Sequence, residues 1–130
     1  MSSTLFLRRV LALDALSCAV MGIVMAAGSA PLAELFGLPA GLVRGAGIVL
    51  LPIAAFIGWL SARRVPPRLL VWLVIVGNVG WTIESFLVLG QYGGSATALG
   101  TAFVLAQAVA VLGLAALEYL GLRKIALAAA

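Results

Sequence analysis

The stretch LVRGAGIVLLPIAAFIGWLSARRVPPRLLVWLVIVGNVGWTIESFLVLG, residues 42–90, consists of two long apolar runs joined by a short basic linker. Each run has roughly the 20 apolar residues that a helix needs to cross a bilayer. In the linker, Pro66 and Pro67 prevent one helix from running through, because proline lacks a backbone N–H and clashes with the preceding turn. The stretch therefore predicts a hairpin of two antiparallel transmembrane helices.

The composition of the whole chain indicates the same environment. Of its 130 residues, 65% are hydrophobic and 9% are charged, and the mean hydropathy is +1.25. A soluble domain of this size has too little interior to bury so much apolar surface. We predict one transmembrane domain, 1–130, with spans over about 10–28, 42–62, 69–90 and 97–120.

The connections between these runs are short. Between the first two spans, Pro31 suits the first turn of a helix and Gly37 suits its end, which predicts an interfacial helix over about 31–36. Short connections favour antiparallel neighbours. The predicted fold class is therefore all-α, with four antiparallel transmembrane helices in an up-down-up-down bundle and a short interfacial helix after the first.

The start of the chain also resembles a signal peptide, with basic residues before an apolar run. Asp14 interrupts that run, and Pro31 would directly follow the cleavage site at residues 28–30. We therefore interpret residues 10–28 as a membrane span that is retained.

The basic residues predict the orientation of the chain. All but Arg44 of the 8 Lys and Arg residues precede the first span, join the second to the third, or follow the fourth. They are Arg8, Arg9, Arg63, Arg64, Arg68, Arg123 and Lys124. The positive-inside rule then places both termini in the cytoplasm. Such short clusters suit anionic lipid headgroups, so we expect membrane lipids as partners and no nucleic acid.

The residue types limit the chemistry that is available. The chain has no His and a single Cys, Cys18, which excludes an internal disulfide and the usual zinc, haem and iron–sulfur ligand sets. Ser-His-Asp and Cys-His catalysis are excluded as well. We expect no metal and identify no cofactor, and an enzyme is the least favoured functional class.

The third span carries an unusual concentration of polar residues, GNVGWTIES at 77–85. Helical spacing places Glu84 on one face with Gly77, Gly80 and Trp81, and we predict that this face points into the bundle. Three polar residues flank it: Asn78, Thr82 and Ser85. Five apolar residues are predicted to face lipid: Val76, Val79, Ile83, Phe86 and Leu87.

Glu84 has two interpretations. A charge at the centre of a span costs ~2.5–3.5 kcal/mol, and an ion pair with Arg44 of the second span recovers ~4 kcal/mol at an effective dielectric near 20. Glu84 is then a structural partner of Arg44. Alternatively, Glu84 is protonated at times and lines a path or ligand cavity. Arg44, Asn78, Ser85 and Gln107 would complete that site.

A second polar cluster is predicted near the cytoplasmic face. Asp14 and Glu118 lie at similar depths in the first and last spans, and Arg9 and Arg123 flank them. Either these arginines reach the carboxylates by snorkelling and anchor the helices, or the two carboxyls lie close together and share a proton.

In the second span, Gly41 and Gly45 form a GxxxG pair, which favours close helix contact within a chain or between chains.

The run LFGLPAGLVRGAGIVLLP at 35–52, followed by VWLVIVGNVGW at 71–81, resembles a group of small bacterial four-span proteins that have no assigned activity. The shared features are Asp in the first span, Gly-Leu-Pro in the following turn, Arg-Gly at the start of the second span and Asn-x-x-Trp in the third. The resemblance implies a bacterial inner-membrane location. DoxX-like proteins are similar in size and span count only.

Three functions fit these observations. The first is an oligomeric transporter or channel that uses Glu84 as its intramembrane carboxylate, which the predicted inward polar stripe favours. The second is an accessory subunit that binds a lipid or quinone, either as a homo-oligomer or with a partner membrane subunit. The third is an intramembrane enzyme that uses Glu84 or Asp14 as general acid–base on a lipid-soluble substrate, for which the sign would be an apolar cavity open sideways to lipid with a carboxylate at its end.

Overall fold

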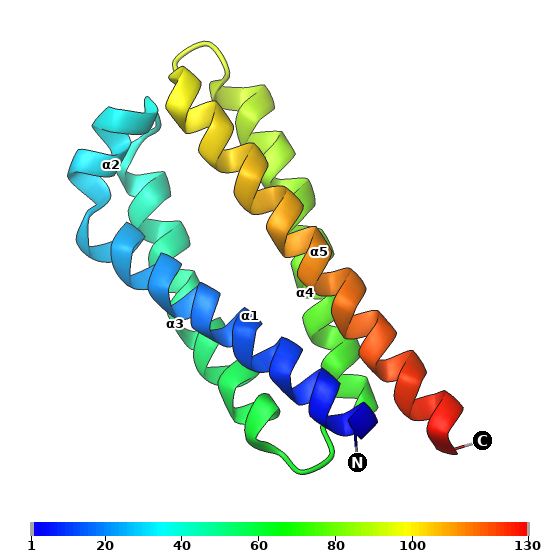
Figure 1. Ribbon diagram of the computed structural model, residues 1–130. Coiled ribbons are helices and arrows are strands. Elements are labelled where there is room, and N and C mark those ends of the chain that lie inside the picture. Colours follow the sequence, from blue (N-terminus) through cyan, green and yellow to red (C-terminus); the bar gives the residue numbers. More distant parts are fainter. Residues whose placement is uncertain (1, 130) are drawn as a thin grey trace.

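The structure, a computed structural model, describes residues 2–129, and side chains over residues 4–128. This part of the chain is all-helical and contains no strand (Figure 1). Its helices are α1 (Ser2–Ala27), α2 (Ser29–Phe36), α3 (Ala40–Ala62), α4 (Arg68–Tyr92) and α5 (Ala98–Ala129). The predicted fold class is confirmed, including the short helix after the first span.

Four helices, α1, α3, α4 and α5, are long and apolar enough to cross a membrane. The chain is therefore a multi-pass membrane protein. The outermost helices are longer than the apolar runs that predict them. α1 begins at Ser2 and α5 continues to Ala129, because basic and small residues end an apolar run without ending a helix.

The short helix α2 begins almost directly where α1 ends and stops at Gly37. The backbone of Gly37 has φ 69°, a left-handed conformation, and its N–H donates to the carbonyl oxygen of Ala33. Glycine is the residue that adopts this conformation without strain, which explains why the helix ends here.

The four long helices form two pairs. α1 packs against α3, and α4 packs against α5, while α1 also contacts α5 and joins the pairs (Figure 1). α3 and α4 are consecutive and antiparallel but scarcely touch, so the expectation that all consecutive spans are packed neighbours was wrong for this hairpin. Loop length limits how far apart two helices lie, but side-chain fit decides which of them pack.

Two glycines explain why α1 and α3 pack so closely. A Cβ atom on Gly47 would lie 2.5 Å from the backbone nitrogen of Ala26, and one on Gly22 would lie 3.0 Å from the carbonyl oxygen of Gly47. By contrast, Gly41 and Gly45 have nothing within 4 Å of the equivalent position. The GxxxG pair therefore makes no close contact within the described chain.

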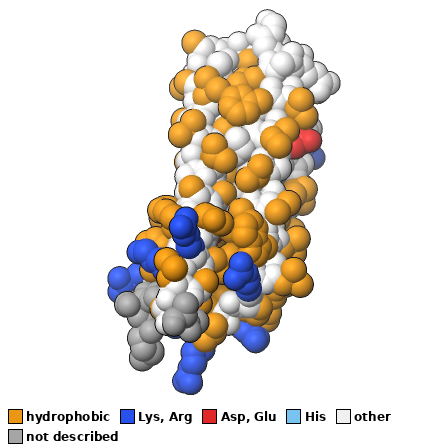
Figure 2. Space-filling model, turned by 90° about the vertical axis from the view of Figure 1, so that its right-hand side faces the viewer, with side chains coloured by type: hydrophobic (Ala, Val, Ile, Leu, Met, Phe, Trp, Pro, Cys, Tyr) orange, Lys and Arg blue, Asp and Glu red, His pale blue; other side chains and the backbone are white. Residues whose placement is uncertain are grey.

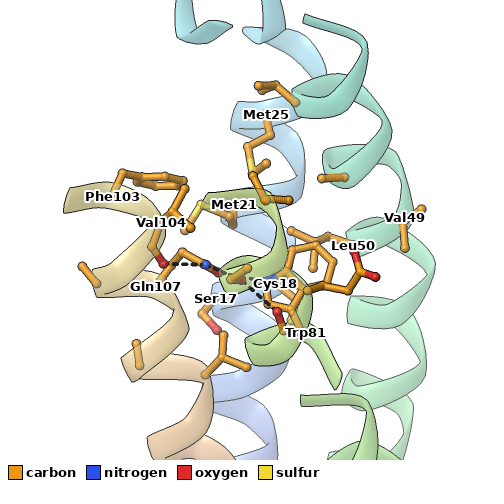
Figure 3. Close-up of a pocket in the computed structure, with 18 of the residues that line it drawn as sticks. Ser17, Cys18, Met21, Met25, Val49, Leu50, Trp81, Phe103, Val104 and Gln107 are labelled. Carbon is orange, nitrogen blue, oxygen red and sulfur yellow. Dashed lines mark hydrogen bonds between the residues drawn. The ribbon is translucent and has the colours of Figure 1, made fainter. Parts of the chain in front are cut away.

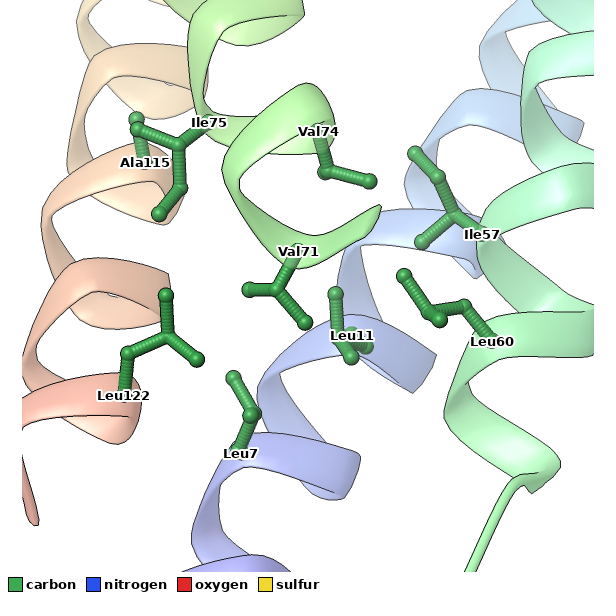
Figure 4. Close-up of a cluster of buried hydrophobic side chains, with 9 residues drawn as sticks. All are labelled: Leu7, Leu11, Ile57, Leu60, Val71, Val74, Ile75, Ala115 and Leu122. Atoms are coloured by element: carbon green, nitrogen blue, oxygen red, sulfur yellow. The ribbon is translucent and has the colours of Figure 1, made fainter. Parts of the chain in front are cut away.

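The end of the molecule that carries the termini is solidly packed. Nine buried apolar side chains from all four long helices form one cluster there (Figure 4): Leu7, Leu11, Ile57, Leu60, Val71, Val74, Ile75, Ala115 and Leu122. Lipid tails are as apolar as these side chains, so van der Waals packing, rather than transfer from water, stabilises the cluster.

At the opposite end, α2 joins the two helix pairs. The backbone N–H of Thr97 donates to the carbonyl oxygen of Phe36 at 2.9 Å, and the Thr97 hydroxyl donates to that of Leu35 at 2.8 Å. The rings of Phe36 and Phe103 stack with their centroids 4.6 Å apart. We call these contacts, together with the hydrogen bond from Ser95 Oγ to the carbonyl oxygen of Gly37, the α2 bridge.

The surface divides in the same direction. Figure 2 shows basic side chains gathered toward the end where the termini lie and hydrophobic side chains over much of the remaining face. The five residues of α4 that were predicted to face lipid are all exposed: Val76, Val79, Ile83, Phe86 and Leu87. An apolar exposed surface of this kind is what a bilayer covers.

Candidate functional site

A buried polar cluster lies at the centre of the molecule, where α1, α4 and α5 meet. The Nδ2 atom of Asn78 donates to Oδ2 of Asp14 at 2.8 Å and to Oε1 of Glu118 at 2.9 Å. The exposed fractions of Asp14, Asn78 and Glu118 are 1%, 8% and 0%. One amide nitrogen therefore connects two carboxyl groups from different helices. We call these three residues the carboxyl cluster.

The two carboxyl groups are not equally satisfied. The other oxygen of Asp14, Oδ1, accepts a hydrogen bond from the thiol of Cys18 at 3.6 Å, one helical turn further along α1. The other oxygen of Glu118, Oε2, is buried and has no hydrogen-bond partner. Buried polar atoms rarely lack a hydrogen-bond partner. Oε2 of Glu118 is therefore a buried acceptor for which the protein supplies no donor.

The polar face of α4 explains how Asn78 reaches this position. Asn78, Thr82 and Ser85 follow each other at helical spacing and are all buried. The Thr82 hydroxyl donates to the backbone oxygen of Asn78 at 3.0 Å, and the Ser85 hydroxyl donates to that of Trp81 at 2.8 Å. Each hydroxyl is thus satisfied by its own helix, and the Asn78 side chain is left to bond to other helices.

A second polar network joins α4 to α5 nearer the α2 bridge. The indole N–H of Trp81 donates to Oε1 of Gln107 at 2.8 Å. The Nε2 atom of Gln107 donates to the hydroxyl of Ser85 at 2.8 Å and to the backbone oxygen of Val104 at 2.8 Å. This network fixes the ring plane of Trp81 and the rotamer of Gln107.

A cavity of about 590 Å³ lies between the two helix pairs, on the α2 side of the carboxyl cluster. Side chains from all five helices line it, among them Phe36 of α2. Figure 3 shows Met21 and Met25 of α1, Leu50 of α3, Trp81 of α4, and Phe103 and Gln107 of α5 around it. Most of its wall is apolar. Its polar or ionisable lining side chains are Ser17, Cys18, Trp81, Glu84, Ser85 and Gln107.

A second cavity of about 400 Å³ occupies the gap between α3 and α4. Asn78 lines it, so it leads to the carboxyl cluster. Cys18, Leu50, Trp81 and Val111 line both cavities, so the two are separated only by these side chains.

Both cavities open sideways rather than toward the ends of the helices. Val49, which lines the larger cavity, is 52% exposed, and Leu73, which lines the smaller one, is 59% exposed. Both residues belong to the helices that scarcely touch, α3 and α4. The openings therefore lie on the apolar surface that faces hydrocarbon.

The structure places Glu84 differently from the prediction. Its side chain is exposed and lines the edge of the larger cavity, and Gly77 and Gly80 are exposed too. The prediction that the inward face of α4 is centred on Glu84 was wrong. Hydrogen bonding to α1 and α5 turns Asn78 toward the interior, and Glu84 therefore lies at the edge of the larger cavity. Arg44 is also exposed, and within the described chain no ion pair joins it to Glu84.

The predicted site residues therefore separate into groups. Ser85 and Gln107 come together at the larger cavity, and Asn78 belongs to the carboxyl cluster instead. Arg9 and Arg123 are exposed, and in the part of the chain that the structure describes neither forms an ion pair with Asp14 or Glu118. The partner of the two carboxyls is Asn78, which was not predicted as a member of the second polar cluster.

No known protein family, curated protein or solved structure matches this chain. The chemistry of the site therefore has to be inferred from its own residues. Within the described residues, no group of three or more His, Cys, Asp or Glu side chains is placed to hold a metal ion. What the site offers is an apolar cavity, neutral hydrogen-bonding groups on its wall and a pair of buried carboxyls beside it.

Proposed function

We propose that this protein binds a lipid-soluble molecule in the larger cavity, between the α1–α3 and α4–α5 pairs. The observation that carries the proposal is the cavity of about 590 Å³ with an apolar wall and few polar groups. Small-molecule sites are typically concave, mostly apolar and about 300–1,000 Å³ in volume. This cavity has those properties within the membrane-spanning part of the chain.

The lining indicates the class of ligand. Met21, Met25 and Leu50 offer an apolar surface to an elongated body, and methionine adapts to irregular shapes. Gln107, Ser85 and the Trp81 ring offer contacts for one small polar head or a flat ring. Entry is from the hydrocarbon side, between α3 and α4. A molecule with an elongated apolar body and a single small polar group fits these conditions.

The alternative of transport along Glu84 and Arg44 has different requirements. Both side chains are exposed on the protomer, so a path that they line would need another chain to cover it. Binding in the cavity needs no second chain. For this reason the geometry supports binding better than transport, and the lipid- or quinone-binding hypothesis better than the channel hypothesis.

A homo-oligomer remains part of the proposal, for a separate reason. Arg44 and Glu84 carry charge on surfaces that otherwise face lipid, and each such charge costs ~2.5–3.5 kcal/mol near the centre of a span. Contact with a second copy that pairs them would reduce this cost. The gathering of basic side chains near the termini (Figure 2) supports an orientation with both termini in the cytoplasm. The resemblance of residues 35–52 and 71–81 to small bacterial four-span proteins supports a bacterial inner-membrane location.

The test uses the fluorescence of Trp81. The chain has three tryptophans, so replacing Trp59 and Trp72 by Phe leaves Trp81 as the only emitter. A brominated long-chain alcohol is added to this variant in lipid nanodiscs, since bromine quenches tryptophan on close contact. We expect saturable quenching, which indicates a site, rather than quenching that rises linearly as the probe partitions into lipid.

A matched pair of variants locates the site. Ala46→Phe fills the larger cavity from α3, whereas Ala55→Phe adds the same ring at an exposed position of α3 that lines neither cavity. We expect Ala46→Phe to weaken saturable quenching at least about tenfold and Ala55→Phe to leave it unchanged, the tenfold loss corresponding to about 1.4 kcal/mol. Equal, linear quenching in all variants would refute the proposal.

A further inference from the structure

The carboxyl cluster has an unusual balance of hydrogen-bond donors and acceptors. Two carboxyl groups bring four oxygen atoms into a buried space. The protein donors that reach them are the amide of Asn78 and the thiol of Cys18. Oε2 of Glu118 receives none, and the single Nδ2 atom of Asn78, 2.8 Å from Oδ2 of Asp14 and 2.9 Å from Oε1 of Glu118, holds the two carboxyl groups beside each other. With both groups ionised, two negative charges would lie next to each other with only neutral donors around them.

Among the side chains of residues 4–128, no Lys or Arg forms an ion pair with either carboxyl group. α1 contributes Asp14 and Cys18, α5 contributes Glu118, and α4 contributes the neutral Asn78. The α3 residues that line the smaller cavity together with Asn78 are all apolar: Leu50, Pro52, Ile53, Phe56 and Ile57. Of the two basic residues on α1, Arg9 is exposed and Arg8 donates to the backbone oxygen of Ser61 instead. Burying an unpaired ion costs several kcal/mol, so two adjacent carboxylates would be very unfavourable here.

We propose that Asp14 and Glu118 together form a proton-binding site, in which one proton is shared between the two carboxyl groups and Asn78 positions both. The proton supplies the donor that Oε2 of Glu118 lacks. It also reduces the buried charge from two negative charges to one, which the two N–H groups of Asn78 and the Cys18 thiol then stabilise. Two close carboxyls that share one proton are a known consequence of like-charge repulsion.

The site is accessible from the membrane side. Asn78 lines the smaller cavity, and Cys18 lines both cavities. A proton donor or acceptor in the gap between α3 and α4 is thus separated from the carboxyls by these two side chains. The inference does not depend on the proposed ligand, because the pair holds its proton whether or not the larger cavity is occupied.

Infrared spectroscopy tests the inference directly, because a protonated carboxyl and a carboxylate absorb at different frequencies. The chain has only 4 Asp and Glu residues. In the variant E34Q/E84Q, Asp14 and Glu118 are the only remaining side-chain carboxyls. For this variant in lipid bilayers at neutral pH, we expect about one carboxylic acid per chain and, besides the carboxylate of the C-terminus, about one side-chain carboxylate. Two side-chain carboxylates, or two acids, would overturn the proposal.

Two further measurements identify the groups and the ligand. Adding D14N or E118Q to the E34Q/E84Q variant should abolish the one-to-one signal, because a single carboxyl has no partner with which to share a proton. Repeating the measurement with sodium replaced by choline should leave the spectrum unchanged. An acid band that appears only without sodium would overturn the proposal, since the site would then hold a metal cation rather than a proton. The decisive spectrum is that of E34Q/E84Q, in which Asp14 and Glu118 are both unmutated. The inference is therefore testable even if adding D14N or E118Q prevents folding.

Discussion

At the scale of single residues, Asn78 supplies the hydrogen bonds that satisfy the two buried carboxyl groups at the centre of the molecule. Its one amide nitrogen donates to carboxyl groups on two other helices, and it is therefore the link through which α4 is fixed against both α1 and α5. Inside a membrane no water is present to replace such bonds, so their loss leaves buried acceptors unpaired. The orientation of this small side chain therefore affects how three helices are fixed against one another.

Replacement of Asn78 by Leu should therefore destabilise the fold markedly. Two acceptors lose their donor, and each unsatisfied buried acceptor costs about 1–3 kcal/mol. We expect a loss of at least about 2 kcal/mol in the free energy of unfolding, measured by denaturant titration in mixed micelles. Thr82→Val is the matched control, since Thr82 is buried one turn away on the same face and bonds to backbone oxygens. Equal losses for the two variants would contradict this role of Asn78.

Glu84 should behave in the opposite way. It is exposed on the protomer, and no ion pair joins it to Arg44 in the described chain, so its charge costs free energy without a compensating contact. We expect Glu84→Gln to leave the unfolding midpoint of the isolated protomer unchanged or slightly higher. The midpoint is measured at low protein concentration, where copies do not associate. A clear decrease there would mean that Glu84 has a stabilising partner within its own chain.

The sequence allowed only part of this arrangement to be predicted. Asp14 and Glu118 lie at similar depths on helices of known direction, so their proximity was a reasonable expectation. The role of Asn78 was not, because the rotation of a helix about its axis depends on which neighbours it packs against. Glu84 is the only charge in that part of α4, so a helical face centred on it is centred on the wrong residue.

At the scale of helices, the closeness of α1 and α3 depends on two glycines. Gly22 and Gly47 lie where the two backbones meet, and Gly47 has no room for a Cβ atom. Small residues at such crossings let membrane helices approach closely and gain van der Waals contact. Gly41 and Gly45 have the better-known spacing but lie on an open surface. Spacing alone therefore did not identify the contact.

Gly47→Ala and Gly45→Ala form a matched test on one helix. The Cβ of the first would lie 2.5 Å from the backbone nitrogen of Ala26, whereas the second has nothing within 4 Å. We expect Gly47→Ala to destabilise by about 1–3 kcal/mol through overpacking and Gly45→Ala to be neutral or stabilising, because Ala favours helices. Thermal unfolding followed by circular dichroism distinguishes them. Destabilisation by Gly45→Ala would indicate that its surface is covered by a second copy.

The helix boundaries were easier to predict than the helix contacts. Hydropathy and prolines indicated where each helix lies, because crossing a bilayer sets a minimum length and Pro66 and Pro67 interrupt the chain. They did not indicate that α3 and α4 separate. Apolar side chains fit against many partners, and the residues that decide the pairing, such as Gly47, are recognised only once the neighbour is known.

At the scale of the whole molecule, the chain combines a packed half and a hollow half. The buried apolar cluster fills the end with the termini, and the cavities occupy the middle and the part near α2. This division was not predicted, since both halves are built from similar apolar residues. The carboxyl cluster lies between them and separates the solid region from the region that opens to lipid.

The hollow half should respond to ligand. A molecule that binds the folded state alone stabilises it by RT ln(1 + [L]/Kd), or about 2.7 kcal/mol at a hundredfold excess over Kd. We expect the brominated alcohol to raise the unfolding temperature of the unmodified chain and of Ala55→Phe, but not that of Ala46→Phe. Fluorescence-detected thermal unfolding in nanodiscs provides the measurement. An equal rise in all three would show a general effect of the alcohol on the bilayer.

The α2 bridge has a consequence for how occupancy of the interior is detected. Hydrogen bonds from the backbone N–H and the side-chain hydroxyl of Thr97 hold one end of the two helix pairs together, and dense packing holds the other. The distance between the two helix pairs is therefore fixed independently of what occupies the cavities. Distance probes placed on opposite helices will report little change when a guest arrives or leaves. A bound molecule will instead be detected by local reporters, such as the emission of Trp81 or the methyl resonances of Met21 and Met25.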